Sequence, residues 1–305
     1  MRLEDGAFLV ARLTAALFSA VAFLPTLLVT WAVRRRKPTP EFRHVLVTGA
    51  SAGIGEALAV SLAKPGVVLT VVARDVSRLA GVSRQCKELG AEVVCEAVDV
   101  SNRRAVLEMV ERAEKLRPLD LVIANAGIAP VADGIAEAQE VIDTNLGGVV
   151  STVNAALPGM RKRRSGHILV VTSLAAYAPP TNFLMIAYGA SKAGVRSYAL
   201  GLRMALQPEN VCVTVACPGF VRSRMVERQM EAGVKPLMMW SAEDAAQRMV
   251  EAVEQGDAEV CFPLALASAT MFLGALPCWL VDWMRPILVS GDPFASYASG
   301  GSKKD

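Results

Sequence analysis

Histidine is the residue that this chain of 305 residues uses least. Only His44 and His167 are present, so a metal centre with imidazole ligands has almost nothing to be built from. The six cysteines include no CxxC pair and no regular framework, which excludes a disulfide scaffold and fits a reducing compartment. We therefore expect neither a metal site nor structural disulfides.

Excess charge is also absent. The 32 Lys and Arg residues nearly balance the 29 Asp and Glu residues, and the formal net charge of +3 argues against a nucleic-acid partner. Charged residues make up only 20% of the chain and hydrophobic residues 53%, with a mean hydropathy of +0.37. This composition excludes disordered and collagen-like classes. The apolar excess gathers at the two ends of the sequence.

The first apolar stretch, residues 13–33, contains no charge. Roughly 20 apolar residues in a helix span a bilayer core of about 30 Å. The stretch contains Trp31 near its end and is followed by the basic cluster 34–37, as in an interfacial anchor whose basic flank stays cytosolic. We expect residues 1–40 to form a transmembrane anchor and linker, with the rest of the chain facing the cytosol. A cleaved signal peptide and a buried hairpin are the alternatives.

The second apolar stretch, residues 263–281, is also uncharged and is interrupted by Gly274 and Pro277. A second span, a re-entrant hairpin and a segment lying in the membrane interface all fit this pattern. The alternative without a membrane is a C-terminal element that closes over a substrate pocket. We expect residues 263–305 to be a membrane-associated segment followed by a polar tail.

Between these ends, residues 41–262 alternate between short β-branched runs and helical stretches. Strands are expected at 44–48, 67–73, 92–97, 119–125, 167–173, 211–217 and 259–262, and helices at 55–64, 102–116, 143–157, 188–206 and 242–254. Continuous apolar strands separated by helices predict a parallel sheet that is buried on both faces. The fold class is therefore one α/β domain, a doubly wound, Rossmann-type sheet of seven parallel strands with helices on both faces.

The first strand leads through TGASAGIG (48–55) directly into a helix. Glycine at positions 49, 53 and 55 lets the backbone approach a pyrophosphate and lets the helix pack closely on the sheet. The phosphates then lie at the positive end of the helix. A glycine-rich turn is weak evidence alone, but a strand before it and a helix after it favour a dinucleotide site.

The TGxxxGxG spacing of this turn resembles the short-chain dehydrogenase/reductase family, whose further motifs follow in order. Ala124 is a departure from that family's Asn-Asn-Ala-Gly turn, and Ser223 stands where the family often has Thr. The resemblance covers about residues 43–262. It implies that the cofactor is bound by Gly49, Ser51, Ala52, Gly53, Ile54, Gly55, Arg74, Asp99, Val100, Asn125, Ala126, Gly127, Tyr188, Lys192, Pro218, Gly219, Val221 and Ser223.

The chemistry centres on Tyr188 and Lys192, which are four residues apart and share one helix face. A neighbouring ammonium favours the phenolate, so we expect a lowered pKa for Tyr188, which then exchanges a proton with a carbonyl oxygen. Ser173 would hydrogen-bond the same oxygen. By resemblance, Lys192 also holds the nicotinamide ribose and Asn145 supports a water chain. The predicted catalytic residues are Asn145, Ser173, Tyr188 and Lys192.

The end of the second strand decides between the two nicotinamide cofactors. An acidic residue there accepts the ribose hydroxyls and repels a 2′-phosphate. By the family's spacing the position is Ala73, followed by Arg74, whose guanidinium suits a phosphate. The next residue, Asp75, is acidic, so NAD(H) stays an alternative. We favour NADP(H).

The anchor and the apolar C-terminal region resemble the membrane-bound 3-ketodihydrosphingosine reductase branch of the family. That resemblance implies NADPH-dependent reduction of a lipid ketone on the cytosolic face of the endoplasmic reticulum. Enzymatic alternatives are a luminal hydroxysteroid dehydrogenase and a very-long-chain 3-ketoacyl-CoA reductase, which would use the basic run 161–164 for the CoA phosphates. A catalytically inactive membrane scaffold is the non-enzyme alternative. The family also implies a homodimer or homotetramer formed through the helices of Asn145 and Tyr188.

Overall fold

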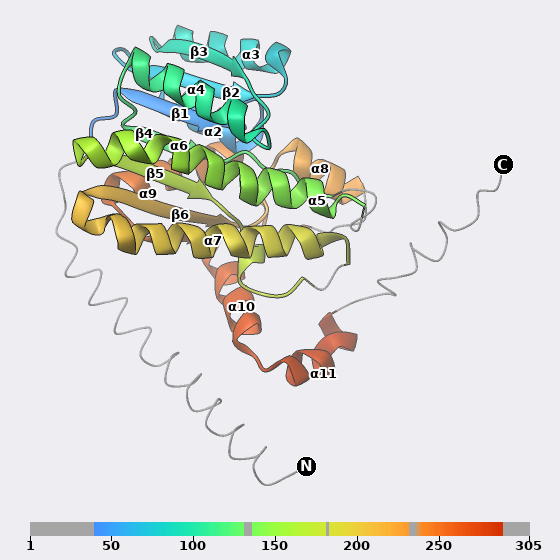
Figure 1. Cartoon of the computed structure of the whole chain (residues 1–305). Helices are drawn as coiled ribbons and strands as arrows, with labels where there is room; N and C mark the ends of the chain where they lie inside the picture. The colour runs from blue at the N-terminus through green and yellow to red at the C-terminus, as the bar shows by residue number, and fades with distance from the viewer. Residues whose placement is uncertain (1–39, 131–135, 181–182, 232–235, 237, 289–305) are drawn as a thin grey trace. The chain divides into compact units, whose positions relative to one another are not determined.

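The computed structural model describes residues 40–130, 136–180, 183–231, 236 and 238–288 (Figure 1). All of them belong to the unit of the chain that begins at Pro40. The predicted anchor, residues 13–33, lies outside the described residues, as does the polar tail.

A seven-stranded sheet forms the centre of the domain. Its strands are β1 (His44–Thr48), β2 (Val68–Ala73), β3 (Glu92–Ala97), β4 (Leu121–Ala124), β5 (Gly166–Val171), β6 (Val211–Pro218) and β7 (Glu259–Phe262). The order is β3-β2-β1-β4-β5-β6-β7, and every neighbouring pair is parallel. The strand order reverses between β1 and β4, where a doubly wound sheet opens a crevice at its carboxyl edge. The predicted fold class is confirmed for this domain.

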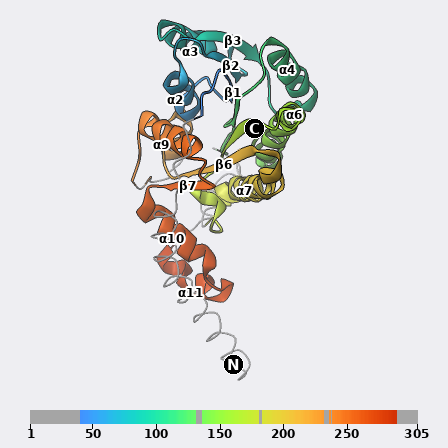
Figure 2. The same cartoon turned by 90° about the vertical axis from the view of Figure 1, so that its left-hand side faces the viewer.

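Helices cover both faces of the sheet, as Figures 1 and 2 show. One layer consists of α2 (Gly53–Leu62), α3 (Val76–Glu88) and α9 (Ala242–Gln255), and the other of α4 (Arg103–Leu116), α6 (Gly148–Arg163) and α7 (Ile186–Leu206). Successive residues of a strand point to opposite faces, so the strands inside the sheet supply both cores, whereas the edge strand β3 has no fully buried residue. This is why the inner strands read as continuous apolar runs.

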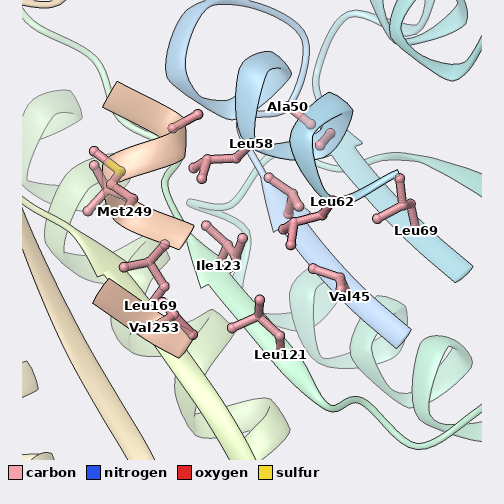
Figure 3. Packing of buried hydrophobic residues seen from close by; sticks show 14 of the residues in the cluster. Val45, Ala50, Leu58, Leu62, Leu69, Leu121, Ile123, Leu169, Met249 and Val253 are labelled. Atoms are coloured by element: carbon pink, nitrogen blue, oxygen red, sulfur yellow. The ribbon is translucent and has the colours of Figure 1, made fainter. Parts of the chain in front are cut away.

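The core between the sheet and the first helix layer is shown in Figure 3. Leu58 of α2 and Met249 of α9 pack toward the strand residues Leu121 and Ile123, and none of these side chains exceeds 1% exposure. Burying a side chain of this size contributes about 1.5–3 kcal/mol. The glycine turn is therefore attached to a strand and a helix that are both anchored in a buried core.

Shorter elements surround the carboxyl edge of the sheet. They are α5 (Ala138–Ile142), the π-helical turn η1 (Asp143–Gly147), α8 (Arg224–Glu231) and the 3₁₀ turns η2 (Leu174–Ala176) and η3 (Phe183–Met185). A further 3₁₀ turn, η4 (Gln207–Glu209), lies at the opposite edge, just before β6. The helix expected at 143–157 in fact begins earlier, with α5 at Ala138, and residues 143–147 form a π turn between α5 and α6. Such single π turns inside helices are frequent at functional sites.

After β7 the chain continues into α10 (Leu264–Ala275) and α11 (Cys278–Leu288), which extend beyond the β7 side of the sheet (Figures 1 and 2). Leu276 has an extended backbone because the proline that follows it disfavours the helical conformation, so α10 ends before this residue. Among the described helices, none alone is long and apolar enough to cross a bilayer. Residues 264–275 and 278–284 reach the required length and composition only together, with a bend of 117° between them.

Candidate active site

The turn after β1 can be built only from glycine at its critical positions. Gly49 and Gly53 have φ angles of +68° and +59°, which side chains rarely adopt. A Cβ on Gly55 would collide with the carbonyl oxygen of Gly49 and lie 2.6 Å from the Asn125 amide nitrogen. No side chain caps the first turn of α2, so its backbone N–H groups face the turn. This cradle suits a pyrophosphate.

Thr48 and Asn125 brace the cradle by tying the end of β1 to the end of β4. The Thr48 hydroxyl accepts from the backbone N–H of Asn125 and of Ala126, at 3.1 and 3.2 Å. The Asn125 amide nitrogen donates to the carbonyl oxygen of Thr48 at 2.9 Å. Asn125 therefore acts on the turn itself, and Thr48 is a positioning residue that the sequence prediction omitted.

A cavity of about 270 Å³ lies over this cradle. The predicted residues that line it are Gly49, Ser51, Ala52, Gly53, Ile54, Gly55, Arg74, Asp99, Val100, Asn125, Ala126, Gly127 and Ser223. These residues lie in the segments that follow β1, β2, β3 and β4, in the first turn of α2 and just before α8, all at the carboxyl edge. The glycine cradle and the uncapped helix end fit the phosphates of a nicotinamide dinucleotide.

Arg74 and Asp75 are adjacent in the sequence but make different contacts. Arg74 lines the cavity, and its guanidinium lies 3.8 Å from the carboxylates of Asp99 and Glu140, with 58% of the side chain exposed. Asp75 caps α3, accepting from the backbone N–H of Ser77 at 3.1 Å and pairing with Arg78 at 2.9 Å. Only Arg74 of the two lines the cavity.

Asp99 is held ionised at the same cavity. Burial raises the pKa of Asp99, but hydrogen bonds from the Ser101 backbone and hydroxyl, with the Arg74 charge, outweigh it and keep that pKa below its ordinary value. The carboxylate is therefore a hydrogen-bond acceptor in the cavity where the resemblance places the cofactor.

Ser173 and Tyr188 line a second cavity of about 340 Å³, which shares Ile54, Asn125 and Gly127 with the first. Ser173 follows β5 and caps the turn η2, where its hydroxyl accepts from the N–H of Ala175 at 3.1 Å. Burial raises the pKa of Tyr188, and a hydrogen bond with Ser173 lowers it by less. The prediction of a lowered pKa for Tyr188 was wrong, because desolvation outweighs the neighbouring groups.

Lys192 lies one turn further along α7 and is only 4% exposed. Its Nζ donates to the carbonyl oxygen of Val171 at 3.1 Å and lies 5.8 Å from the centroid of the Tyr188 ring. Burial lowers the pKa of Lys192 to about 8. The ammonium therefore titrates near neutral pH, where proton transfer takes place.

Asn145 is fully buried in the π turn η1. Its Oδ1 accepts from the N–H of Ile128 at 2.7 Å, and its Nδ2 donates to the Ile128 carbonyl and the Ser191 hydroxyl at 2.9 and 3.1 Å. A Cβ on Gly127 would lie 3.0 Å from Asn145 Oδ1 and 3.4 Å from Lys192 Nζ. Asn145 thus joins the segment after β4 to α7 and lines neither cavity. Its relay role stays a prediction.

The second cavity is also lined by predicted cofactor-binding residues at and after the end of β6 and by several residues that were not predicted. The predicted ones are Pro218, Gly219, Val221 and Ser223. The unpredicted lining residues include Met185, Val226, Gln229, Leu266, Thr270 and Leu273. The last three belong to α10, so the C-terminal element closes over the pocket. The sequence allows this arrangement as the alternative to a membrane-associated segment. Gln229 is buried, and its amide nitrogen donates to the Met185 sulfur.

The family described as short chain dehydrogenase matches residues 43–255, which hold every residue of the catalytic set. The chain belongs to the short-chain dehydrogenase family. The dehydrogenase is 35% identical over 246 residues to an uncharacterized oxidoreductase of Myxococcus xanthus, covering 79% of this chain and 95% of the relative.

Two further relatives carry more specific names. An NADP-dependent 3-hydroxy acid dehydrogenase of Salmonella typhi is 38% identical to this dehydrogenase over 183 residues, 58% of this chain and 72% of the relative. An 11-beta-hydroxysteroid dehydrogenase A of Sesamum indicum is 30% identical over 241 residues, 72% of this chain and 68% of the relative.

Solved structures agree on the fold and on a nicotinamide cofactor. A short-chain dehydrogenase from Sphingobium yanoikuyae in complex with NADPH matches with a TM-score of 0.66 and 25% identity, covering 80% of this chain and 94% of that one. A short chain dehydrogenase from Mycobacterium paratuberculosis bound to NAD matches with a TM-score of 0.65 and 24% identity, covering 74% and 98%. These neighbours differ in cofactor, so they leave the choice between NAD and NADP open.

The geometry suits the roles that the family resemblance assigns to these side chains. A bound nicotinamide would supply a hydride to a carbonyl carbon or accept one from an alcohol carbon. The Ser173 and Tyr188 hydroxyls would hold the carbonyl oxygen, and Tyr188 would donate its phenolic proton to that oxygen as charge develops. The Lys192 ammonium would stabilise the phenolate that forms. Because these three side chains line one cavity, the arrangement is consistent with an oxidoreductase that acts on CH–OH or C=O groups.

Proposed function

We propose that this dehydrogenase reduces a lipid ketone to a secondary alcohol with NADPH, and that 3-ketodihydrosphingosine, which becomes dihydrosphingosine, is its substrate. The proposal rests on the second cavity, where a polar catalytic end and an apolar wall meet. Ser173, Tyr188 and Lys192 form the polar end. Leu266 and Leu273 of α10 belong to the apolar wall. A ketone with a long hydrocarbon chain matches both.

The helix that lines the cavity also carries exposed apolar side chains. On α10, Leu266 and Leu273 face the cavity, whereas Leu264 and Phe272 are 74% and 65% exposed. Trp279 and Trp283 of α11 are exposed as well. Large exposed apolar groups gathered on adjacent helices mark interaction surfaces, and tryptophan favours the membrane interface. This pattern supports a substrate that reaches the cavity from a bilayer surface.

The preference for NADPH rests on the division of tasks between Arg74 and Asp75. The Asp75 carboxylate accepts from Ser77 and pairs with Arg78, so it is engaged at the N-terminus of α3. The Arg74 guanidinium lines the cofactor cavity and is largely exposed. A guanidinium binds a phosphate through charge-assisted hydrogen bonds. The 2′-phosphate of NADPH can therefore bind the Arg74 guanidinium. NADH has no phosphate at this position and would not make this contact.

The membrane part of the proposal concerns residues 1–40 and the two C-terminal helices. Residues 13–33 anchor the protein in the endoplasmic reticulum membrane, and the basic run 34–37 keeps the catalytic domain in the cytosol. A glycosylation acceptor site introduced on the exposed face of α4, inside the catalytic domain and before the second apolar stretch, tests this orientation. Absence of glycosylation is expected, whereas a glycosylated site would favour a luminal enzyme.

The acyl-CoA alternative has weaker support in the structure. Arg161 pairs with Glu209 at 2.6 Å and Arg163 with Glu114 at 2.8 Å. These residues precede the N-terminal end of β5, at the sheet edge opposite the two cavities. A basic entrance for CoA phosphates would need to lie at the carboxyl edge. A catalytically inactive scaffold is disfavoured by Ser173, Tyr188 and Lys192 lining one cavity.

The experiment that tests the function is NADPH consumption by the detergent-solubilised full-length protein. Three substrates are compared at equal concentration: 3-ketosphinganine, a 3-ketosteroid and a long-chain 3-ketoacyl-CoA. The highest kcat/KM is expected with 3-ketosphinganine. A higher value with the 3-ketosteroid would transfer the proposal to a hydroxysteroid dehydrogenase, and consumption with none of the three would overturn it.

A further inference from the structure

Two cysteines lie directly opposite each other at the carboxyl edge of the sheet. Cys217 of β6 and Cys261 of β7 are partners in the parallel register. Neighbouring strands lie about 4.8 Å apart, within the range of about 4.4–6.8 Å that disulfides span between Cα atoms. The two sulfur atoms and a Glu259 carboxylate oxygen lie within 4.8 Å of one another. Both thiols therefore meet the distance requirement for a bridge.

The surroundings of this pair form a polar cluster inside an otherwise apolar layer. The Tyr177 hydroxyl lies 3.1 Å from the Cys261 sulfur and 3.8 Å from the Cys217 sulfur. The Cys217 thiol donates to Glu259 at 3.4 Å. Arg196 forms a bidentate pair with Glu259, at 2.6 and 3.0 Å, and its guanidinium lies 4.3 Å from the Tyr177 ring centroid. The catalytic mechanism uses none of these groups.

We infer that Cys217 and Cys261 are a peroxide-sensitive dithiol that closes to a disulfide beside the active site. The Cys261 thiolate attacks hydrogen peroxide, so that an S–O bond forms, the O–O bond breaks, and hydroxide leaves to become water. The Cys217 sulfur then attacks the sulfenic acid, forming the S–S bond and releasing a second water with the Cys217 proton. The two thiols lose two electrons and two protons, which the peroxide accepts.

The order of the two steps follows from the cluster. Burial and the neighbouring thiols raise the pKa of Tyr177, so its hydroxyl keeps its proton and donates to Cys261. The neighbouring Cys217 and Tyr177 groups and the Arg196 charge lower the pKa of Cys261, and together they outweigh burial and the Glu259 charge. The hydrogen bond with Cys261 and burial raise the pKa of Cys217. Cys261, which is partly exposed, is the attacking thiolate, and the buried Cys217 resolves it.

A divalent metal is a poorer occupant of the same cluster. Cys217, Glu259 and Cys261 supply three ligand atoms, but both carboxylate oxygens of Glu259 already accept from Arg196. A bound cation would lie next to that guanidinium. The existing positive charge favours a thiolate over a second cation.

Bridge formation acts on the site because of where the two residues lie. Cys217 immediately precedes Pro218 and Gly219, which line the second cavity. Cys261 is the second-last residue of β7, and Pro263 and α10 follow that strand directly. Closing the bridge draws the sulfurs to about 2.05 Å and removes the thiol hydrogen bond to Glu259. Small displacements of catalytic geometry reduce turnover up to about a hundredfold.

The test treats the full-length protein with hydrogen peroxide, denatures it in N-ethylmaleimide and maps tryptic peptides by mass spectrometry. A Cys212→Ser, Cys278→Ser background leaves one cysteine in each of the two relevant peptides, 204–222 and the peptide that begins at 249. A disulfide-linked pair is expected, with Cys217 and Cys261 losing alkylation together. Dithiothreitol should restore both.

Cys95 supplies the internal control, because it is exposed and lies on the distant edge strand β3. Cys261→Ser should abolish the linked pair and leave Cys217 alkylated after peroxide. Peroxide should also lower NADPH turnover of the parent protein reversibly, by about tenfold or more. Oxidation of Cys95 with Cys217 and Cys261 fully alkylated would overturn the inference, and this readout needs no knowledge of the lipid substrate.

Discussion

The Nζ of Lys192 lies 5.8 Å from the centroid of the Tyr188 ring, one turn away on the same helix face. Both groups are desolvated, and the consequences have opposite signs. Burial raises the pKa of Tyr188 and lowers that of Lys192 to about 8. The tyrosine therefore keeps the proton that ketone reduction requires, while the lysine charge is available only below that pH.

The pH dependence of reduction follows from Lys192. Its pKa of about 8 lies below the ordinary lysine value, so the ammonium is present at pH 7 and is lost as pH rises through 8. Without it the Tyr188 phenolate loses its stabilising charge, and kcat/KM for reduction should fall on the alkaline side. Steady-state rates from pH 6 to 10 check this, and Lys192→Arg should move the alkaline limb upward. A profile that stays flat above pH 8 would contradict the assignment.

Arg74 should determine the preference for NADPH. Arg74→Ala removes a charge-assisted contact with the 2′-phosphate that contributes about 1.5–3 kcal/mol. The KM for NADPH should rise about tenfold to a hundredfold, while the KM for NADH stays unchanged. Arg104→Ala is the matched control, since Arg104 pairs with Glu108 on the exposed face of α4. Equal losses with both cofactors would argue against a phosphate contact.

Much of this site could be predicted from the sequence, because its residues follow strand ends. The glycine turn follows β1, Asp99 follows β3, Asn125 follows β4 and Ser173 follows β5, and parallel strands bring their carboxyl ends to one edge. Strand positions were close because most strands are continuous apolar runs; the edge strand β3, with Glu92 and Glu96, is the exception. Helix starts were less accurate: the expected start at 188 is Ile186 in the structure, where Met185 makes no side-chain cap.

The remainder could not be predicted because it depends on tertiary burial. From the spacing alone, either Arg74 or Asp75 could face the ribose of the cofactor. The structure separates them because Asp75 caps the N-terminus of α3. The pKa of Tyr188 depends on desolvation, which a sequence does not display. Leu266, Thr270 and Leu273 reach the cavity from a segment far along the chain, and their apolar run reads equally well as a membrane segment. No pattern of residues within residues 263–281 shows which side chains contact the cavity.

The wall formed by α10 should control which chain lengths are accepted. Leu273→Trp adds volume inside the cavity and should lower kcat/KM for a long-chain ketone about tenfold or more relative to a short-chain ketone. Phe272→Trp is the matched control because the neighbouring side chain is exposed. Parallel kinetics with ketones of graded chain length provide the measurement. Equal effects on short and long chains would show that α10 does not contact the substrate.

The glycine turn yields a paired prediction about stability. Gly55→Ala forces a Cβ against the Gly49 carbonyl and should lower the free energy of unfolding by about 1–3 kcal/mol or more. Gly81→Ala lies inside α3, where an added Cβ meets nothing within 4 Å, and should raise it by about 1 kcal/mol. Denaturant unfolding of both variants checks the signs. Destabilisation by Gly81→Ala would contradict the account of α3.

The central claim is that Tyr188 donates the proton in NADPH-dependent carbonyl reduction, and Tyr188→Phe tests it most directly. The variant keeps the ring and removes the hydroxyl, so kcat should fall by about 10²–10⁴-fold with the Kd for NADPH unchanged. Tyr198→Phe on the same helix, which removes only a hydrogen bond to Asn154, should leave kcat intact. Fluorescence titration with NADPH and steady-state turnover are measured on the same preparations. Undiminished turnover of Tyr188→Phe would contradict the mechanism.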